Sequence, residues 1–446
     1  MITRTSSPAE KIRLFRGLFR GREDVYPLRF ESRRTGRAGY APACGNEWVP
    51  GICGKPKIKC ADCPNRKFLE VTDQRIRWHL TGHDEAGRPF VMGVYPMLLD
   101  ETCFWVAIDL DKDEWQKDAK ALLDTSKSMG VPVALERSRS GNGAHLWCFF
   151  SEPILAHLAR KLATLLLTRT MERRPDLGFA SYDRIFPNQD TLPKGGFGNL
   201  IALPLQGLAR EQGNTLFVDE NLMPHPDPWA FLSSINRVGR EEIEGWIHKA
   251  ESKGGLLGVR PVPEDDFAAA PWTAPPSRKR PKLTLPEISE PIQLVLADQL
   301  YVARKSLPPP LRNRLLSLAA FQNPEFYKAQ AMRLPVYNKP RIIACAEEFS
   351  EHIALPRGCR EEVVSLFKDL GTPYELEDKR NPGSPINVTF LGQLKPDQRE
   401  AGRKMLENDI GVLSATTAFG KTVLAAWLIA QRNVNTLILV HRKSYG

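Results

Sequence analysis

The sequence predicts a multidomain protein of the α+β or α/β class, and three observations support this prediction. The chain has 446 residues, too many for one hydrophobic core at the usual domain size of about 150 residues. Between residues 91 and 205, strand-like segments alternate with a long amphipathic segment. Residues 258–291 are dense in Pro and charge, which predicts a linker between globular parts.

Composition narrows the possible partners. The formal net charge is +10 and the sequence pI is about 9.2, which favours nucleic acid as a partner over a membrane surface. No apolar run approaches the roughly 18 residues that span a bilayer. The first residues lack the apolar core of a signal peptide, so we expect a cytoplasmic protein that does not bind membranes.

The predicted elements follow from apolar periodicity. Residues 9–19 and 154–174 have the spacing of amphipathic helices. Strands are expected at 104–111, 131–138, 145–150 and 198–206. These strands should form one largely buried sheet.

Four cysteines close together predict a structural zinc site. They follow the pattern C-x8-C-x6-C-x2-C, and four thiolates suit tetrahedral Zn²⁺: Cys44, Cys53, Cys60 and Cys63. The intervening lysines 55, 57 and 59 are expected to lower the thiol pKa values. Two alternatives stay open: a ligand set that uses His79 and His83 with Cys60 and Cys63, and four free cysteines without metal.

Two acidic residues end the predicted strand 104–111. Asp109 and Asp111 point to the same face, with Cα atoms roughly 6.5 Å apart. Carboxylates held in this way are suitable ligands for two Mg²⁺ or Mn²⁺ ions. Asp183 is a third candidate metal ligand further along the chain.

A glycine-containing turn follows, in the segment ERSRSGNGAHLWCFF. Its backbone amides, with Arg139, Ser140 and His145, are candidates for contacts to a nucleotide phosphate. Lys194, in the segment PKGGFGN, is another candidate. A hairpin turn followed by a hydrogen-bonded histidine is the alternative interpretation of this stretch.

In combination, these motifs resemble the archaeo-eukaryotic primase superfamily, specifically the primase domain of TOTE conflict systems. The resemblance rests on D-L-D, the glycine-flanked His145, Y-D-R-I-F-P-N-Q-D, G-F-G-N-L-I-A-L-P-L-Q and the cysteine segment. It implies a primase-type mixed sheet with an RRM-like catalytic core and a zinc-binding insertion. It also implies that Asp109, Asp111 and Asp183 bind catalytic metals and that His145 contacts the incoming nucleotide's phosphates.

One position departs from the family's pattern. Many members have Ser two positions before the histidine, where this chain has Gly143. Ser138, Ser140 or a backbone amide is expected to take over its contact.

The resemblance implies a primase-polymerase that carries out two-metal nucleotidyl transfer with nucleoside triphosphates on a DNA template, with RNA as a second option, in defence against mobile DNA. Two other functions stay open. Three acids and a histidine also suit a metal-dependent nuclease. The chain is alternatively an inactive nucleic-acid-binding and ATP-binding fragment of a helicase.

The segment ATTAFGKT, residues 415–422, fits a phosphate-binding loop between a predicted strand at 411–415 and a helix. With LKPDQRE before it and LILVHR after it, the region resembles the first RecA-like lobe of superfamily 2 helicases. The expected ATP contacts are Gln398, Ala418, Gly420, Lys421 and Thr422. A Walker B acid pair and a second lobe are not found in the sequence, so we expect no unwinding by this chain alone, and a separate helicase or nuclease component as a partner.

The expected domain order has five parts. These are an N-terminal helical segment (1–39), a primase domain (40–240) with the zinc segment 44–63, a helix with a Pro-rich linker (241–291), a helicase-preceding region (292–390) and a partial RecA-like P-loop unit (391–446).

Overall fold

The computed structural model describes residues 1–32, 35–111, 113–251, 285, 288, 290–305 and 307–439. The chain divides into two compact units. One contains Met1–Leu285 and Pro308–Ala344, and the other contains Pro286–Leu307 and Cys345–Gly446. Most of the predicted Pro-rich linker lies outside the described residues.

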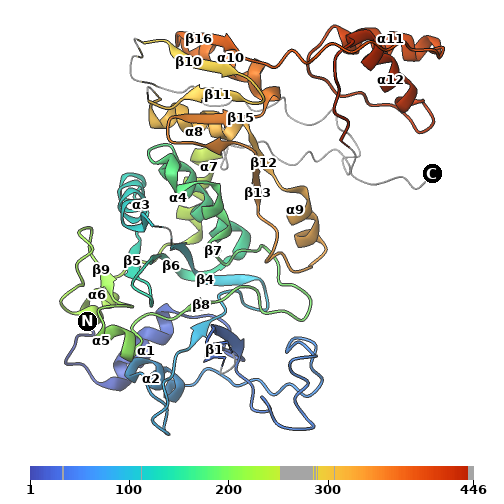
Figure 1. Cartoon of the computed structure of the whole chain (residues 1–446). Coiled ribbons are helices and arrows are strands. Elements are labelled where there is room, and N and C mark those ends of the chain that lie inside the picture. The colour runs from blue at the N-terminus through green and yellow to red at the C-terminus, as the bar shows by residue number, and fades with distance from the viewer. Residues whose placement is uncertain are drawn as a thin grey trace. The chain divides into compact units, whose positions relative to one another are not determined.

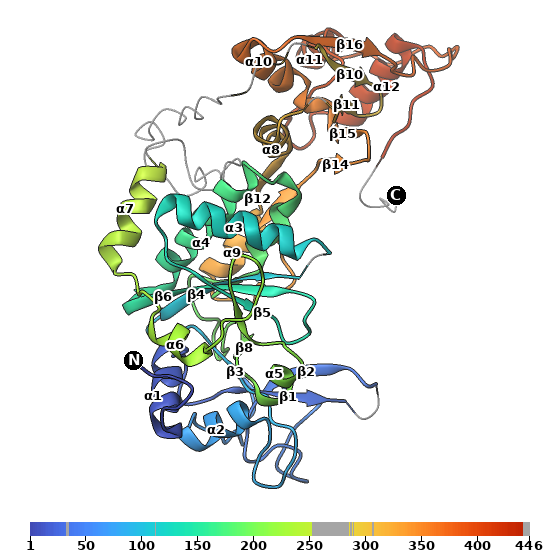
Figure 2. The same ribbon diagram turned by 90° about the vertical axis from the view of Figure 1, so that its left-hand side faces the viewer.

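The first unit is built on a five-stranded sheet (Figures 1 and 2). Its strands lie in the order β7 (Ile185–Phe186), β4 (Thr102–Leu110), β6 (Ala144–Leu155), β5 (Ala134–Arg137) and β9 (Phe217–Val218). Every pairing in this sheet is antiparallel, whereas the family resemblance implied a mixed sheet. The long strands β4 and β6 place Asp109 opposite His145.

Alternation along β4 separates the two faces of the sheet. Val106, Ile108 and Leu110 pack in one core with α3 (Trp115–Met129), α4 (Ala156–Met171) and α7 (Arg240–Glu251). Trp105 and Ala107 pack in a second core with α1 (Pro8–Leu18) and α2 (Asp73–Thr81). Figures 1 and 2 show α3 and α4 on one side of the sheet and α1 and α2 on the other. Asp109 therefore belongs to the face that packs on the N-terminal region.

Helix α1 begins where the sequence favours a start, because Ser7 and Glu10 form a capping box and Pro8 takes the first helical position. The smaller elements of this unit are β1 (Pro27–Glu31), β2 (Ala38–Pro42), β3 (Gly93–Val94), β8 (Ile201–Ala202), α5 (Gly207–Glu211), α6 (Pro228–Ser233) and two 3₁₀ helices, η1 (Pro175–Leu177) and η2 (Phe179–Asp183). Residues 1–39 thus join the same compact unit as the sheet.

The strand predicted at 198–206 is reduced to the two residues of β8, which pair with β3. Gly198 has a φ of 74°, outside the extended region, and Pro204 has no N–H for a sheet hydrogen bond. Both residues therefore prevent the strand from extending further in either direction.

Residues 308–344 also belong to the first unit. They form α8 (Pro309–Leu318), β12 (Ala320–Gln322), α9 (Pro324–Ala331) and β13 (Ile342–Ala344), and β12 pairs with β13. Ala320 and Ile342 are buried in the same core as α3 and α4. The region predicted as one segment, 292–390, is therefore divided between the two units.

The second unit contains another five-stranded sheet, ordered β14 (Glu347–Glu348), β15 (His352–Leu355), β11 (Leu300–Ala303), β10 (Ile292–Leu296) and β16 (Tyr374–Asp378). β10 and β16 are parallel and the other pairs are antiparallel. A 3₁₀ turn, η4 (Arg357–Cys359), leads into α10 (Arg360–Leu370) between β15 and β16. Val363 and Phe367 of α10 are fully buried.

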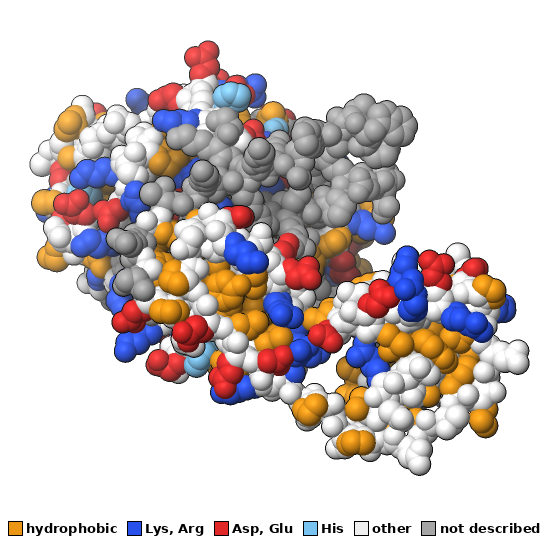
Figure 3. All heavy atoms as spheres, turned by 90° about the horizontal axis from the view of Figure 1, so that it is seen from above, with side chains coloured by type: hydrophobic (Ala, Val, Ile, Leu, Met, Phe, Trp, Pro, Cys, Tyr) orange, Lys and Arg blue, Asp and Glu red, His pale blue; other side chains and the backbone are white. Residues whose placement is uncertain are grey.

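The last described part of the chain contains α11 (Pro396–Leu406) and α12 (Lys421–Arg432). The sequence favours strands at 411–415 and, in NTLILVHR, at 435–442. No strand is formed over 411–415 or 435–439, and residues 440–442 lie outside the described residues. Apolar side chains of both segments are consequently exposed, among them Val412 (95%) and Leu437 (82%). Figure 3 shows apolar side chains at the surface of this part of the chain. None of the described helices is long and apolar enough to cross a membrane.

Candidate active site

Asp109 and Asp111 lie at the end of β4, as the sequence predicted. Asp109 is the last residue but one of the strand, and Asp111 follows it. Their side chains are 24% and 44% exposed. Burial raises the pKa of Asp109, and the nearby charge of Asp111 raises it further, while His145 and Arg184 oppose the shift. Two carboxylates this close favour a bound cation.

Arg184 supplies a positive charge to this pair. Its Nη1 forms an ion pair with Oδ2 of Asp111 and lies 3.7 Å from Oδ2 of Asp109. The backbone holds it there, because the N–H of Asp109 donates to the carbonyl of Arg184 at 2.9 Å. The guanidinium thus offsets part of the negative charge of the two carboxylates. The sequence predicted no such role for Arg184.

His145 lies across from Asp109 on the neighbouring strand β6. Its Nε2 is 3.7 Å from Oδ1 of Asp109, and its Nδ1 is 2.9 Å from Oε2 of Glu136 on β5. Burial by itself lowers the pKa of His145, but the carboxylates of Glu136 and Asp109 raise it above its usual value. The histidine is therefore held between two acids.

Glu136 is a site residue that the sequence did not single out. It is 1% exposed, and its Oε2 also accepts a hydrogen bond from Nε1 of Trp147 at 2.9 Å. A carboxylate is very rarely buried without partners, and here both partners come from alternate residues of β6. The one available signal in the sequence was an acid inside an otherwise apolar strand.

Asp183 lies at the end of η2, just before β7, which pairs with β4. Burial raises its pKa to about 6. Its Oδ1 accepts a hydrogen bond at 2.8 Å from the backbone N–H of Arg341. The third acid is thus brought to the same end of the sheet as Asp109 and Asp111.

In the arrangement described, these acids do not surround one common metal position. Among the residues that the structure describes, no three His, Cys, Asp or Glu side chains lie close enough together to hold one ion. The donor set nevertheless suits Mg²⁺ or Mn²⁺, because both prefer carboxylate oxygens. The position of Arg184 next to two of the acids is consistent with a site that attracts cations.

The turn between β5 and β6 explains why residue 143 is a glycine. A Cβ at Gly143 would lie 2.5 Å from the carbonyl oxygen of Leu110 and 3.3 Å from Oγ of Ser138. A serine does not fit there without moving β4. Ser138 and Ser140 instead lie in the turn, with their hydroxyl oxygens 3.2 Å apart.

Arg139 and Lys194, two of the predicted phosphate contacts, lie in different surroundings. Arg139, in the turn beside Ser140, is half-buried, and burial, with Arg29 nearby, lowers its pKa. Lys194 is exposed, its backbone N–H donates to the carbonyl of Arg333 at 3.1 Å, and the next residue, Gly195, lies beside the carbonyl of Ala61. The backbone hydrogen bond of Lys194 therefore connects it with residues 308–344, and its neighbour Gly195 lies near the cysteine segment.

The four clustered cysteines line one small cavity of about 20 Å³. None of them forms a disulfide. Burial raises the pKa of Cys60, and Lys55 opposes this shift. The predicted lowering by lysine is therefore present at Lys55, but the pKa of Cys60 as a whole is raised. As the side chains stand, the described residues form no metal-holding cluster here, but four thiols around one cavity are a suitable donor set for zinc.

His79 is not available to the cysteines. It is fully buried, its Nε2 donates to the carbonyl of Pro204 at 3.0 Å, and its Nδ1 accepts from the N–H of Met92 at 3.2 Å. Burial lowers its pKa to about 4. His83 is exposed and does not line the cysteine cavity. The surroundings of these two histidines therefore do not support the alternative ligand set.

The predicted phosphate-binding loop precedes α12, and its lysine, Lys421, is exposed but bonded to the loop itself. Nζ of Lys421 donates to the carbonyls of Ala415 and Thr416 at 2.9 and 2.8 Å. Ala418 and Gly420 both have positive φ, at 66° and 87°, and Thr422 is exposed. The lysine thus binds the backbone carbonyls of its own loop.

Gln398 of α11 supports the same loop. Its Nε2 donates to the carbonyl of Phe419 at 2.6 Å, and its Oε1 accepts from the N–H of Lys395. With 4% exposure, its amide is occupied by the backbone.

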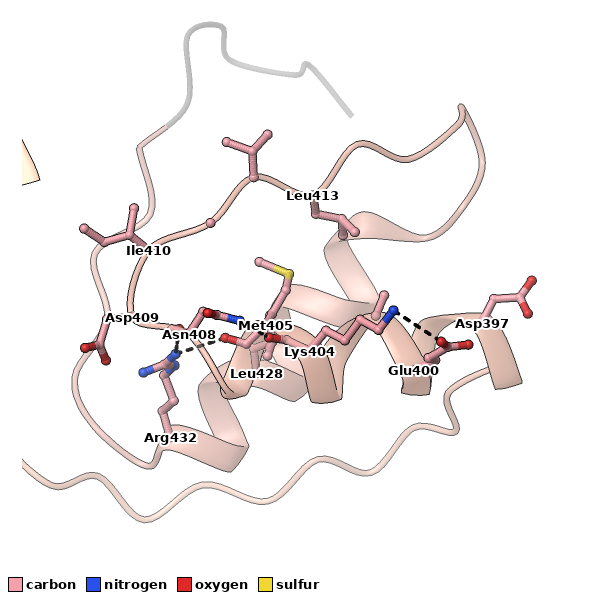
Figure 4. A pocket seen from close by; sticks show the side chains of 13 residues that line it. Asp397, Glu400, Lys404, Met405, Asn408, Asp409, Ile410, Leu413, Leu428 and Arg432 are labelled. Carbon is pink, nitrogen blue, oxygen red and sulfur yellow. Dashed lines mark hydrogen bonds and ion pairs between the residues drawn. The ribbon is translucent and has the colours of Figure 1, made fainter. Parts of the chain in front are cut away.

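A larger cavity of about 600 Å³ lies elsewhere in this part of the chain, between α11, α12 and residues 408–413 (Figure 4). Nη2 of Arg432 donates to the carbonyls of Met405 and Asn408 at its edge. The acids of the first unit do not line it, and neither do Lys421 and Thr422. Its lining combines charged side chains, such as Glu400 and Lys404, with apolar ones from residues 410–413, which form no strand.

Comparison with known proteins gives a family match within the first unit. Residues 10–246 match the model of the family described as "TOTE conflict system, Archaeo-Eukaryotic Primase domain". No curated protein matches the chain. Among solved structures, a similar one is the polymerase domain of ligase D from Mycobacterium tuberculosis in complex with DNA, at 14% identity and a TM-score of 0.25, over 55% of this chain and 89% of that one. The family match spans more than half of the chain and includes all three acids and His145, so the chain belongs to the archaeo-eukaryotic primase domain family of TOTE conflict systems.

Proposed function

We propose that this chain is a primase-polymerase that adds nucleotides to a strand on a nucleic-acid template. The observation that carries the proposal is the arrangement of Asp109, Asp111 and His145 at one end of adjacent strands, inside the region that matches the primase family. Acidic groups beside a buried histidine whose pKa is raised suit nucleotidyl transfer, in which a hydroxyl attacks the α-phosphate of a nucleoside triphosphate and pyrophosphate leaves.

Asp109, Asp111 and Asp183 are the residues that would hold two Mg²⁺ or Mn²⁺ ions, which when bound activate the attacking hydroxyl and stabilise the leaving pyrophosphate. Nη1 of Arg184 pairs with Asp111 and lies 3.7 Å from Oδ2 of Asp109, and bound cations would take over part of this charge compensation. The three carboxylates position the ions, and Glu136 keeps His145 oriented toward Asp109.

The turn between β5 and β6 is the proposed site for the triphosphate. His145 would donate from Nε2, and Ser138 or Ser140 would supply the hydroxyl that the family pattern places at residue 143. The short distance from Ser138 Oγ to the position of a Cβ on Gly143 supports this exchange. Arg139 adds positive charge at the turn. Lys194 is a weaker candidate, because its described contacts lie outside the turn.

A DNA template is the first choice and RNA the second, in keeping with the net charge of +10. We also propose a structural Zn²⁺ on Cys44, Cys53, Cys60 and Cys63, supported by their shared cavity. A role in defence against mobile DNA, together with a separate helicase or nuclease component, follows from the family's conflict-system context.

A second candidate function is ATP binding by residues 415–422. The positive φ values of Ala418 and Gly420 before α12 suit a loop whose amides surround a phosphate. Lys421 and Thr422 would contact the phosphates and Mg²⁺, and Gln398 would support the loop. This proposal concerns binding and does not extend to unwinding.

A template-extension assay tests the main proposal. The chain is given primed and unprimed templates, Mn²⁺ or Mg²⁺ and either ribo- or deoxynucleotides, beside Asp109→Asn, Asp111→Asn and Asp183→Asn. We expect longer products from the unchanged chain and a loss of at least about 100-fold in each variant, since removal of a metal ligand removes transition-state stabilisation.

Asp113→Asn is the matched control. Asp113 is exposed, two residues beyond Asp111, so the same loss of charge there should leave extension unchanged. Shortened templates would favour the nuclease instead. If Asp109→Asn changes neither extension, nor cleavage, nor nucleic-acid binding, the inactive binding module is favoured.

A further inference from the structure

The third acid, Asp183, is held by a segment that lies outside the part of the chain matched by the family. That match ends at residue 246, whereas the backbone N–H that donates to Oδ1 of Asp183 belongs to Arg341. We propose that residues 308–344 complete the catalytic unit and that Arg341 is a positioning residue for Asp183. The inference rests on the proposed function.

The contact is suited to fix a carboxylate. A hydrogen bond from a backbone N–H to an ionised oxygen is short and roughly twice as strong as a neutral one, and this one measures 2.8 Å. It occupies Oδ1 and restricts rotation of the carboxylate, so the other oxygen keeps a defined direction. A donor on rigid backbone is more effective here than one on a mobile side chain.

The backbone of Arg341 is itself well anchored. The next residue, Ile342, begins β13 and is buried in the core of the catalytic sheet. The carbonyl of Arg341 accepts from the N–H of Asn323 at 2.9 Å, which ties it to the start of α9. Elements β13 and η2 are in contact. The donor to Asp183 is therefore part of a packed hairpin.

The side chain of Arg341 holds the loop that follows Asp183. Arg341 is 1% exposed, its Nη2 donates to the carbonyl of Asn188, and its guanidinium stacks over the ring of Phe326 with its centre 4.8 Å from the ring centroid. Removal of this buried guanidinium should loosen residues 183–190 without removing the backbone donor.

A second anchor holds the far end of the same loop. Nε2 of Gln330 donates to Oδ2 of Asp190 at 2.8 Å, and Oε1 of Gln330 accepts from the N–H of Asp190 at 3.1 Å. Asp190 is also bound by Arg160 of α4. Residues 308–344 thus contact the loop of the third acid at both ends, while Arg312 pairs with Asp176 ahead of it at 2.7 Å.

The test compares Arg341→Ala with Lys339→Ala in the full chain. Lys339 lies two residues away, and its ion pair is with Glu325 of the same segment, so it matches the change in charge without touching the loop. The readouts are the unfolding temperature, Mn²⁺ binding followed by electron paramagnetic resonance without nucleotide, and kcat and KM for extension.

We expect Arg341→Ala to weaken Mn²⁺ binding and to lower kcat by about tenfold each, as loss of a group that orients a metal ligand does, with KM for the template unchanged. Lys339→Ala should match the unchanged chain in every readout. A folded Arg341→Ala that binds Mn²⁺ and extends normally would overturn the proposal.

If Arg341→Ala does not fold, hydrogen exchange measured on the unchanged chain tests the proposal instead. Mn²⁺ should slow amide exchange in peptides that cover 336–344 together with those that cover 180–190, and leave 352–370 unaffected. Slowing at 180–190 alone would overturn the proposal. Failure of the unchanged chain to extend any template would instead refute the proposed function, because the Mn²⁺ and exchange measurements do not depend on extension.

Discussion

Glu136 accepts a hydrogen bond from Nδ1 of His145 at 2.9 Å from within the sheet, where the glutamate is 1% exposed. The bond leaves Nε2 of the histidine facing Asp109. The orientation of His145, the proposed phosphate contact, thus depends on Glu136, which is not itself one of the proposed metal or phosphate ligands.

Glu136→Gln is expected to lower extension by about tenfold, because an amide is a weaker acceptor than a carboxylate and no longer supports a charged imidazole. Glu136→Ala should also cost about 1–3 kcal/mol of unfolding free energy, since it leaves two buried donors without a partner. Extension kinetics and chemical denaturation measure these effects. The exposed Glu152, on the far part of β6, offers Glu152→Gln as a control that should change neither.

Gly143→Ala is expected to destabilise the site, because its new Cβ would lie 2.5 Å from the carbonyl oxygen of Leu110. Overpacking of this kind costs about 1–3 kcal/mol, and the displaced strand end carries Asp109 and Asp111, so extension should fall with stability. Gly245→Ala is the matched control, since nothing lies within 4 Å of its added Cβ. That helix substitution should be neutral or slightly stabilising. Equal unfolding free energies for the two variants would contradict the prediction.

His79 should make stability depend on pH. Its folded pKa is about 4 against an ordinary 6.5, so the unfolded chain binds more protons between these values and stability rises with pH. The contribution is fully present above about pH 6.5 and is lost as the pH falls toward 4, by roughly 3 kcal/mol in total. Denaturation at pH 7.5 and 5 tests this. His79→Gln should flatten the dependence, whereas the exposed His83 gives His83→Gln as a control that retains it.

The cysteine cavity predicts bound zinc. We expect about one Zn²⁺ per chain by elemental analysis, with loss of the metal and a lower unfolding temperature in Cys60→Ser or after chelation. Cys345→Ser, at an exposed cysteine of the second unit, should keep both. Metal-free protein with full thermal stability would argue for four free thiols.

Lys421→Ala is expected to weaken ATP binding at least tenfold, because it removes the cation that would meet the phosphates. A fluorescent ATP analogue titrated into the full chain measures this. Lys404→Ala removes an exposed lysine of α11 that pairs with Glu400 and should bind ATP normally. Equal affinities for both variants would show that the loop is not the nucleotide site.

Local pattern was sufficient for β4, α1 and α4, because side-chain periodicity depends on neighbours in the chain. It was also sufficient to nominate Asp109, Asp111, His145 and Asp183, whose residue types and order identify the family. It failed at 411–415, where an apolar run predicted a strand. A strand needs a partner to bond with, and the described residues provide none there.

By itself, therefore, the sequence was sufficient to nominate the candidate site residues and to predict that Asp109 and Asp111 share one face of a strand. Only the tertiary structure decided what surrounds them. Glu136 reaches His145 because β5 pairs with β6, Arg184 reaches Asp111 because β7 pairs with β4, and Arg341 reaches Asp183 across 158 residues of chain. Such contacts depend on which elements pack together, and that is a property of the whole core rather than of any one segment.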